Sequence, residues 1–150
     1  MGRRYHSRGS RAVGTNLTTL TLISAATIRP RLYDLIIGCA ATPADQAANW
    51  AVQRFTADGT GGTLFAPVAI DPGDPAALAT SRQAPVTTEP TYTASAFVFQ
   101  ASVNQRATFR WVSAPNGELI APATAANGLG AKTEAATGVA AHEVSIWWEE

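Results

Sequence analysis

Residues 92–113 read YTASAFVFQASVNQRATFRWVS, and this stretch decides the fold class. Phe97, Phe99, Ala101 and Val103 recur at every second position, a period that predicts a β-strand with one buried face. An Asn-Gln pair then turns the chain, and the following segment again alternates aromatic with polar side chains. The stretch therefore predicts two successive strands that run in opposite directions.

Segments with the same period lie on both sides of this stretch. The sequence predicts further strands at 17–26, 31–41, 50–57, 63–70, 118–121 and 139–148. In the last segment, we expect His142, Val144, Ile146 and Trp148 to face the core. Seven or eight short strands joined by Gly- and Pro-rich turns are typical of an all-β antiparallel sandwich of jelly-roll type.

Two short segments carry signals for single helical turns. Residues 42–45 (TPAD) place a Thr cap before a Pro at the first helical position, and an Asp-Pro pair repeats this signature before 76–79. Residues 58–62 (DGTGG) predict a hairpin-type loop, because their glycines allow the positive φ of tight turns. Residues 71–91 predict a long crossing between two parts of the sheet.

Charge is distributed unevenly along a chain whose formal net charge is zero, with eleven basic and eleven acidic residues. Residues 1–31 contain six arginines and no acidic residue. Four of these arginines lie near the start of the chain, namely Arg3, Arg4, Arg8 and Arg11. Because their neighbours show no apolar period, we expect 1–16 to form a flexible basic arm and 17–150 to form one β-sandwich domain.

The four arginines of this arm are candidate partner-binding residues. Clustered arginines suit the acidic face of a protein partner, where they form charge-assisted hydrogen bonds. Nucleic-acid phosphates are the alternative partner, and a solvated tail without any partner is the third interpretation.

The residues that usually carry catalysis or metal binding are scarce, since the chain has two histidines and one cysteine. His142 and Ser145 lie three residues apart on a predicted strand, so they point to opposite faces. Residues 128–133 (GLGAKT) lack the earlier glycine and the Gly-Lys pair of a phosphate loop. Cys39 lies in the most apolar run and is expected to be a buried, inert thiol. We therefore expect no catalytic residue, no cofactor and no metal site.

Residues 17–26 form the longest apolar stretch near the start of the chain, but they are interrupted by threonines. This stretch is too short and too polar for a signal core or a membrane span. We therefore expect no membrane partner.

Trp147 is the aromatic residue that does not fit a core position. On the predicted strand it shares a face with Glu143, Ser145 and Glu149, so a large ring lies on a polar surface. Such a residue is a candidate anchor of a protein interface, with a sugar-stacking platform and a partly covered rim position as the alternatives. Several other aromatic residues are expected to face the core: Trp50, Trp111, Trp148, Phe97, Phe99 and Phe109.

A set of short strings gives the chain an overall pattern between residues 28 and 150. These strings are RLYD at 31–34, TPAD at 42–45, Trp50 with Gln53-Arg54, GTG at 59–61, Asp71-Pro72, TEPTY at 88–92, NQRATFRW at 104–111, PAT at 122–124, Asn127-Gly128 and WEE at 148–150. The pattern resembles a family of small virion proteins of tailed bacteriophages, some of which are similar to capsid decoration (cement) proteins. The first eleven residues have no counterpart in it.

The resemblance implies a non-enzymatic β-sandwich that is made in the host cytoplasm and located on the capsid surface of a virion. It implies binding to the major capsid protein, association with other copies of the chain as a homotrimer, and contacts with other virion proteins. It brings no catalytic residues and no cofactor.

Four other functions stay open on the sequence. The chain is alternatively another virion component, such as a tail, neck or host-recognition protein. A carbohydrate-binding module would use Trp147 or Trp50 as its sugar platform. A nucleic-acid-binding protein would use the basic arm, and an enzyme is disfavoured by the scarcity of His and Cys.

Overall fold

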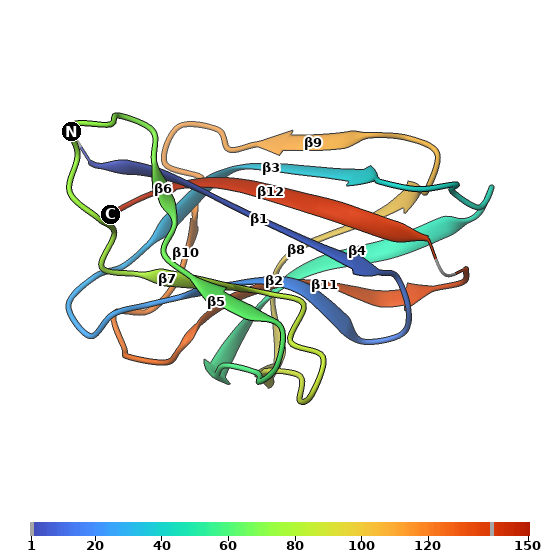
Figure 1. Cartoon of the computed structure of the whole chain (residues 1–150), viewed down its shortest axis with the longest axis horizontal. Helices are drawn as coiled ribbons and strands as arrows, with labels where there is room; N and C mark the ends of the chain where they lie inside the picture. The colour runs from blue at the N-terminus through green and yellow to red at the C-terminus, as the bar shows by residue number, and fades with distance from the viewer. Residues whose placement is uncertain (1, 139) are drawn as a thin grey trace.

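The computed structural model describes residues 2–138 and 140–150, which form β-strands joined by loops (Figure 1). No helix occurs in these two ranges. The strands are β1 (Arg4–Ala12), β2 (Leu17–Ile23), β3 (Arg31–Cys39), β4 (Ala47–Ala57), β5 (Thr63–Phe65), β6 (Val68–Ala69), β7 (Thr80–Gln83), β8 (Thr91–Asn104), β9 (Phe109–Val112), β10 (Leu119–Ile120), β11 (Gly128–Ala136) and β12 (Ala141–Glu149).

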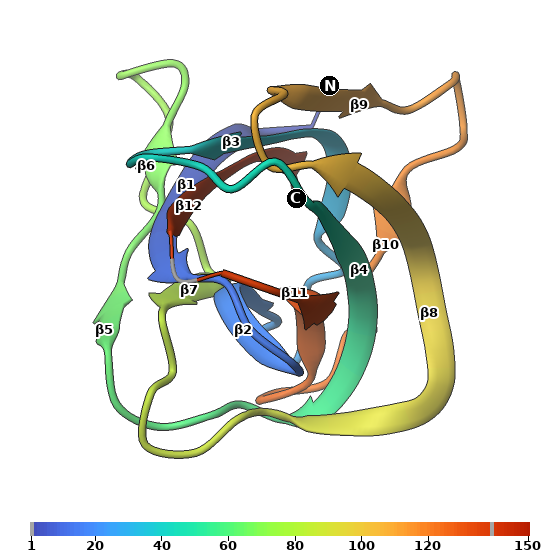
Figure 2. The ribbon, with the colours of Figure 1, turned by 90° about the vertical axis from the view of Figure 1, so that its right-hand side faces the viewer.

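The strands form two antiparallel six-stranded sheets packed face to face (Figure 2). Sheet A has the order β10-β3-β12-β1-β6, and β9 also pairs with β3. Sheet B has the order β5-β7-β2-β11-β4-β8. The predicted all-β antiparallel sandwich is confirmed.

The strand pairing follows the jelly-roll scheme, in which a long hairpin is rolled into two sheets. Four antiparallel pairs join early strands to late ones: β1 with β12, β2 with β11, β3 with β9 and β4 with β8. The first and third pairs belong to sheet A, and the other two belong to sheet B. Between β4 and β8, the chain makes an excursion in which β6 pairs with β1 and β7 pairs with β2.

The core lies between the sheets and is built by the inward side chains of both. Its largest members are Trp50, Trp148 and Tyr5, each at most 2% exposed. The predicted inner face of the last strand is confirmed, because His142, Val144, Ile146 and Trp148 are all buried. Burial of these large rings is the main source of stability that this core offers.

The segment that the sequence predicts as a flexible arm instead forms β1, which lies between β12 and β6 in sheet A. Its inward residues are Tyr5, Ser7 and Gly9, so the strand lacks the apolar period of the others. The Ser7 hydroxyl accepts hydrogen bonds from the Trp148 indole (3.2 Å) and from Ser81 (2.7 Å). Because polar burial replaces apolar burial here, the sequence pattern missed this strand, and residues 4–12 of the predicted arm belong to the sandwich.

The predicted helical turns are also absent from the described residues, since 42–45 and 76–79 form bends and loops. A proline after a polar residue starts a loop as readily as a helix, and a single turn gains too few hydrogen bonds to persist. The loop at 58–62 does not close a hairpin either, because β4 and β5 lie far apart in sheet B.

Strand β11 (Gly128–Ala136) was missed, since its glycines suggest a loop. A Cβ atom at Gly128 would overlap the carbonyl oxygen of Leu22, and one at Gly130 would overlap the phenol of Tyr92. These glycines therefore serve close packing inside a strand.

Candidate binding surface

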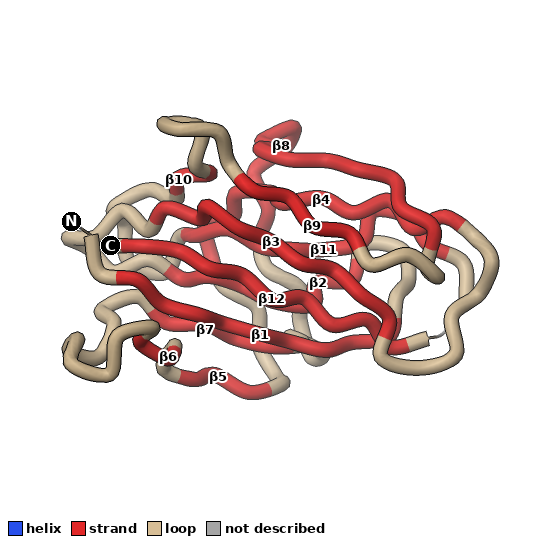
Figure 3. The backbone as a smooth tube through the Cα atoms, turned by 90° about the horizontal axis from the view of Figure 1, so that it is seen from above, coloured by secondary structure: helices blue, strands red, loops and turns tan. Residues whose placement is uncertain are grey.

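The outer face of sheet A carries cross-strand rows of side chains, because register partners in an antiparallel sheet point to the same side. The central row consists of Val68, His6, Trp147, Asp34 and Val112. The adjacent row consists of Arg8, Ser145, Ile36 and Arg110. We call these nine residues the sheet A surface. Figure 3 shows the strands β1, β12, β3 and β9 that carry it lying side by side.

Trp147 lies at the centre of the sheet A surface, as the sequence predicts for an outward position on this strand. Its ring packs against the His6 ring, with 4.7 Å between centroids and 39° between planes. Both residues are half-buried. Burial lowers the pKa of His6 below its ordinary value, and the Arg8 charge lowers it further. The stack therefore presents a neutral aromatic patch at pH 7.

A bidentate ion pair lies beside this patch. Asp34 is 7% exposed and accepts hydrogen bonds from Arg110 Nε (3.0 Å) and Nη2 (2.5 Å). These bonds raise the pKa of Arg110, whose side chain stays 60% exposed. The pair holds β9 against β3 and leaves a cationic edge at the surface.

The ends of the sheet A surface are apolar. Val68 on β6 is 66% exposed, and Val112 on β9 is 56% exposed. The row thus places two half-buried rings and two exposed valines beside the Asp34–Arg110 ion pair, a combination of apolar and charged groups that is expected of a protein-binding surface.

Three of the four predicted partner-binding arginines are exposed, and they lie at two places in the structure. Arg8 is exposed on the sheet A surface, and Arg3 and Arg4 are exposed at the end of the sandwich where the termini lie (Figure 1). Arg4 lines a cavity of about 210 Å³ with Tyr33, Glu118 and Glu149. These three arginines remain candidates for binding an acidic partner.

Arg11 is not available to a partner, which corrects its prediction as a binding residue. Its guanidinium donates to Glu89 Oε1 at 2.6 Å and to the carbonyl oxygens of Thr18 and Pro85. The other carboxylate oxygen of Glu89 accepts the Thr18 backbone N–H at 2.9 Å. The Arg11 side chain is 13% exposed, so this ion pair joins β1 to the loop before β8.

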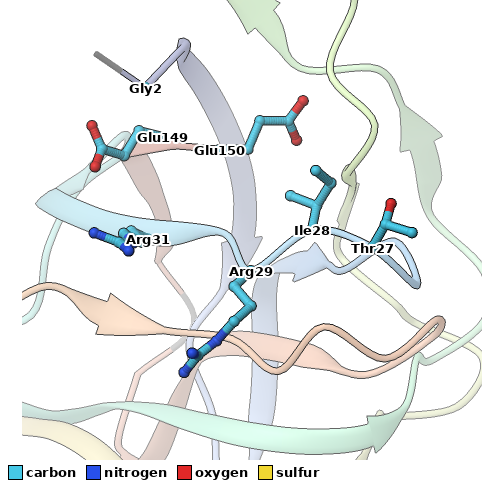
Figure 4. A pocket seen from close by; sticks show the side chains of 7 residues that line it. All are labelled: Gly2, Thr27, Ile28, Arg29, Arg31, Glu149 and Glu150. Carbon is cyan, nitrogen blue, oxygen red and sulfur yellow. The ribbon is translucent and has the colours of Figure 1, made fainter.

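A second cavity, of about 420 Å³, lies beside the paired ends of the chain. Arg3 and Glu150 exchange two backbone hydrogen bonds of 3.0 Å there. Figure 4 shows Arg29 pointing away from both Glu149 and Glu150 at this cavity. Arg29 and Arg31 form no ion pair within the described part of the chain, so their charges face solvent. The sequence does not single out these two arginines as site residues, although they belong to its basic first segment.

The outer face of sheet B differs from that of sheet A because the Tyr92 side chain covers it around Gly130 and Lys132. Tyr92 crosses Gly130, its hydroxyl lies 2.7 Å from Thr18 Oγ1, and its ring meets Phe55 edge-on at 6.2 Å. The Lys132 ammonium lies 4.4 Å from the centroid of the Tyr92 ring. Burial raises the pKa of Tyr92 well above its ordinary value.

Lys132, the chain's single lysine, is therefore a structural residue. It is 6% exposed and pairs with Glu134 at 2.6 Å, while its ammonium donates to Gln53 Oε1 at 3.2 Å. A buried ammonium needs such a full set of partners to offset the cost of its desolvation.

Several other sequence predictions are resolved by side-chain positions. Trp50 is 2% exposed and is therefore not a sugar platform. Phe97 was expected in the core but is 40% exposed.

Cys39 is half-buried at the end of β3, with its thiol 3.3 Å from the Ala41 carbonyl oxygen, so its full burial was wrongly predicted. His142 is buried, and its Nδ1 lies 3.1 Å from the Ala140 carbonyl oxygen. Its Nε2 has no hydrogen-bond partner among the residues that the structure describes.

In residues 2–138 and 140–150, no group of three or more His, Cys, Asp or Glu side chains could hold a metal ion. The described chain also contains no helix with the length and hydrophobicity needed to cross a bilayer. Comparisons of the chain with protein family models, curated proteins and solved structures find no match.

Proposed function

We propose that this chain is a non-enzymatic structural protein of a tailed-bacteriophage virion. It would be made in the host cytoplasm and would bind the major capsid protein lattice from outside, as a decoration (cement) protein. The resemblance of residues 28–150 to small virion proteins supports this role. A rigid two-sheet body that exposes one sheet face supports it as well.

The sheet A surface is the observation that carries the proposal. The strands β1, β12 and β3 are each paired on both sides, so the surface is held in one shape before binding. Preformed surfaces lose little conformational entropy when a partner docks. Trp147 supplies the aromatic anchor, and the exposed Val68 and Val112 add apolar contacts at the two ends of the row.

Repetition supplies the strength of attachment in this proposal. A capsid lattice offers the same contact many times, so modest individual contacts hold firmly when neighbouring copies also contact each other. Arg8 on the sheet A surface and Arg3 at the end of the sandwich suit acidic residues of the capsid protein.

Imaging of particles that contain this chain tests the proposed location. Cryo-electron microscopy should show density for the sandwich spread over the capsid surface. Density confined to the tail, the neck or one vertex would assign another virion role. Particles without the chain would contradict a virion role altogether.

A variant tests the proposed surface directly. Trp147→Ala should lower the occupancy of the protein on undecorated heads at least about tenfold, because interface anchors of this kind dominate binding. Leu64→Ala is the matched control, since Leu64 is 52% exposed on β5 of the other sheet. Equal occupancy of both variants would exclude the sheet A surface as the attachment site.

A carbohydrate-binding module is the second candidate, because Trp147 is a half-exposed ring on a β-sandwich. Binding of the purified protein to a glycan array, lost in Trp147→Ala, would favour this function. Retention on heads without any glycan binding would favour the decoration role.

A further inference from the structure

Strand β8 (Thr91–Asn104) has features that set it apart from every other edge strand in the described chain. It is 14 residues long, it lies at the edge of sheet B, and it pairs only with β4 in the described residues. Its sequence, TYTASAFVFQASVN, contains no charged residue. An edge strand of this kind presents unpaired N–H and C=O groups as a template for another strand.

The other edges of the sandwich are protected in the usual way, by being short. Strand β5 has three residues, β6 and β10 have two each, and β9 has four. Short edge strands offer too few hydrogen bonds to recruit a partner. Strand β8, with 14 residues, therefore lacks the protection that short length gives to the other edge strands.

The side chains of β8 are self-complementary. Phe99, Ala101 and Val103 lie opposite the buried residues Val52, Trp50 and Ala48 of β4, so they face the interior. The residues between them, Gln100 and Ser102, are exposed on the outer face. If a second β8 pairs antiparallel about Ala101, Phe99 comes opposite Val103 and Gln100 comes opposite Ser102. Apolar residues then meet apolar residues, and no like charges meet.

An aromatic cluster lies between the two sheets at this same edge. The Phe99 ring is 5.9 Å from the Phe109 ring and 5.7 Å from the Trp111 ring. All three residues are only half-buried, and Phe97 is 40% exposed. Figure 2 shows β8 and β9, which carry these rings, at one side of the sandwich. A core-like cluster that stays partly open at an edge indicates that another protein surface covers it.

We propose that β8 docks a second copy of this chain through antiparallel β8–β8 pairing about a two-fold axis. The two six-stranded B sheets then become one continuous sheet across the dimer. Main-chain hydrogen bonds of β8 hold the copies together, and the aromatic cluster of each copy is covered by the other. This interface belongs to the free protein and does not depend on the proposed capsid role.

The oligomeric state of the full chain tests the proposal. Sedimentation equilibrium should give a dimer that dissociates on dilution. Hydrogen exchange should show that the backbone amides of 97–104 become more protected as the protein concentration rises, while amides of the short edge strands do not change. A protein that stays monomeric up to its solubility limit would overturn the proposal.

Charges placed on β8 test the pairing itself. The double substitution Gln100→Lys with Ser102→Lys changes only exposed side chains, so the fold is retained, and it sets lysines opposite lysines in the dimer. The dissociation constant should rise at least about tenfold. The matched control, Thr63→Lys with Leu64→Lys, adds the same charge at exposed positions of the β5 edge and should leave the dimer intact.

A charge-swap experiment separates β8 pairing from a general effect of charge. Mixing the lysine variant with Gln100→Glu/Ser102→Glu should restore dimers that contain one copy of each. A dimer that tolerates the lysines would place the interface elsewhere. Protection of 97–104 that arises only on added phage heads would assign β8 to a capsid partner, which contradicts self-pairing but leaves the proposed function standing.

Discussion

The outer faces of the two sheets differ in how far they are covered, although both sheets belong to one jelly roll. The part of the face of sheet B around Thr18, Gly130 and Lys132 is covered by Tyr92 and by the loop that carries Glu89, and its polar groups bond to each other. The face of sheet A has no such cover over Trp147 and Arg8, which stay partly or fully exposed. The comparison indicates that one face contributes to stability and the other is available for binding.

The largest expected effect comes from separating Tyr92 from the face of sheet B. Gly130→Val places a side chain where the Tyr92 phenol now lies, so the phenol must leave its contacts with Thr18 and Lys132. We expect the free energy of unfolding to fall by about 3 kcal/mol, measured by urea denaturation.

Gly38→Val is the matched control on the open face. Gly38 lies in β3 opposite Glu143, and the nearest atom to its added Cβ would be a Thr108 side-chain atom at 3.6 Å. The free energy of unfolding should change by at most about 0.5 kcal/mol. Equal losses in the two variants would contradict the difference between the faces.

We expect an intermediate loss of stability when the Arg11–Glu89 ion pair is removed, because it anchors the loop that covers part of the face of sheet B. Glu89→Ala removes the partner of Arg11 and the acceptor of the Thr18 backbone N–H. The free energy of unfolding should fall by about 1–2 kcal/mol, since a largely buried guanidinium loses its charged acceptor. Glu143→Ala, on the open face, should change it by less than about 0.5 kcal/mol. If Glu89→Ala leaves the free energy of unfolding unchanged, the cover on the face of sheet B is held by Tyr92 alone.

The smallest effect concerns the pH dependence of the open face. Burial, and then Arg8, lower the pKa of His6 in the folded state, so the unfolded chain binds this proton more readily. Stability should therefore decrease as pH falls through the ordinary histidine pKa of about 6.5. His6→Gln should remove this part of the decrease, measured by urea denaturation on both sides of that pH. An unchanged pH profile would mean that burial and the Arg8 charge do not disfavour the charged imidazole in the folded state.

Apolar alternation predicted much of the fold. It located β8 and β12, because apolar or aromatic side chains recur at every second position in both strands, and it identified the buried face of β12, including His142 and Trp148. It failed for β1, whose inward Ser7 and Gly9 show no apolar period and whose Ser7 is buried through hydrogen bonds. It also failed for β11, where glycines at the outward positions serve close packing against Leu22 and Tyr92.

The candidate site was predictable only in part. The outward position of Trp147 follows from the alternation along the strand, since its neighbours Ile146 and Trp148 face the core. The loss of Arg11 as a binding residue does not, because Glu89 lies 78 residues away and is brought to Arg11 by the fold. The His6–Trp147 stack and the Asp34–Arg110 pair likewise depend on strand order.

The neighbours β1 and β12, in the middle of sheet A, come from opposite ends of the strand order. During translation, β1 is made long before β12, its main pairing partner, and the edge of β1 that faces β12 stays unpaired while the strands between them are made. Chaperones can protect the nascent chain during this interval. Because pairing between such distant segments is slow, we expect sheet A to assemble late.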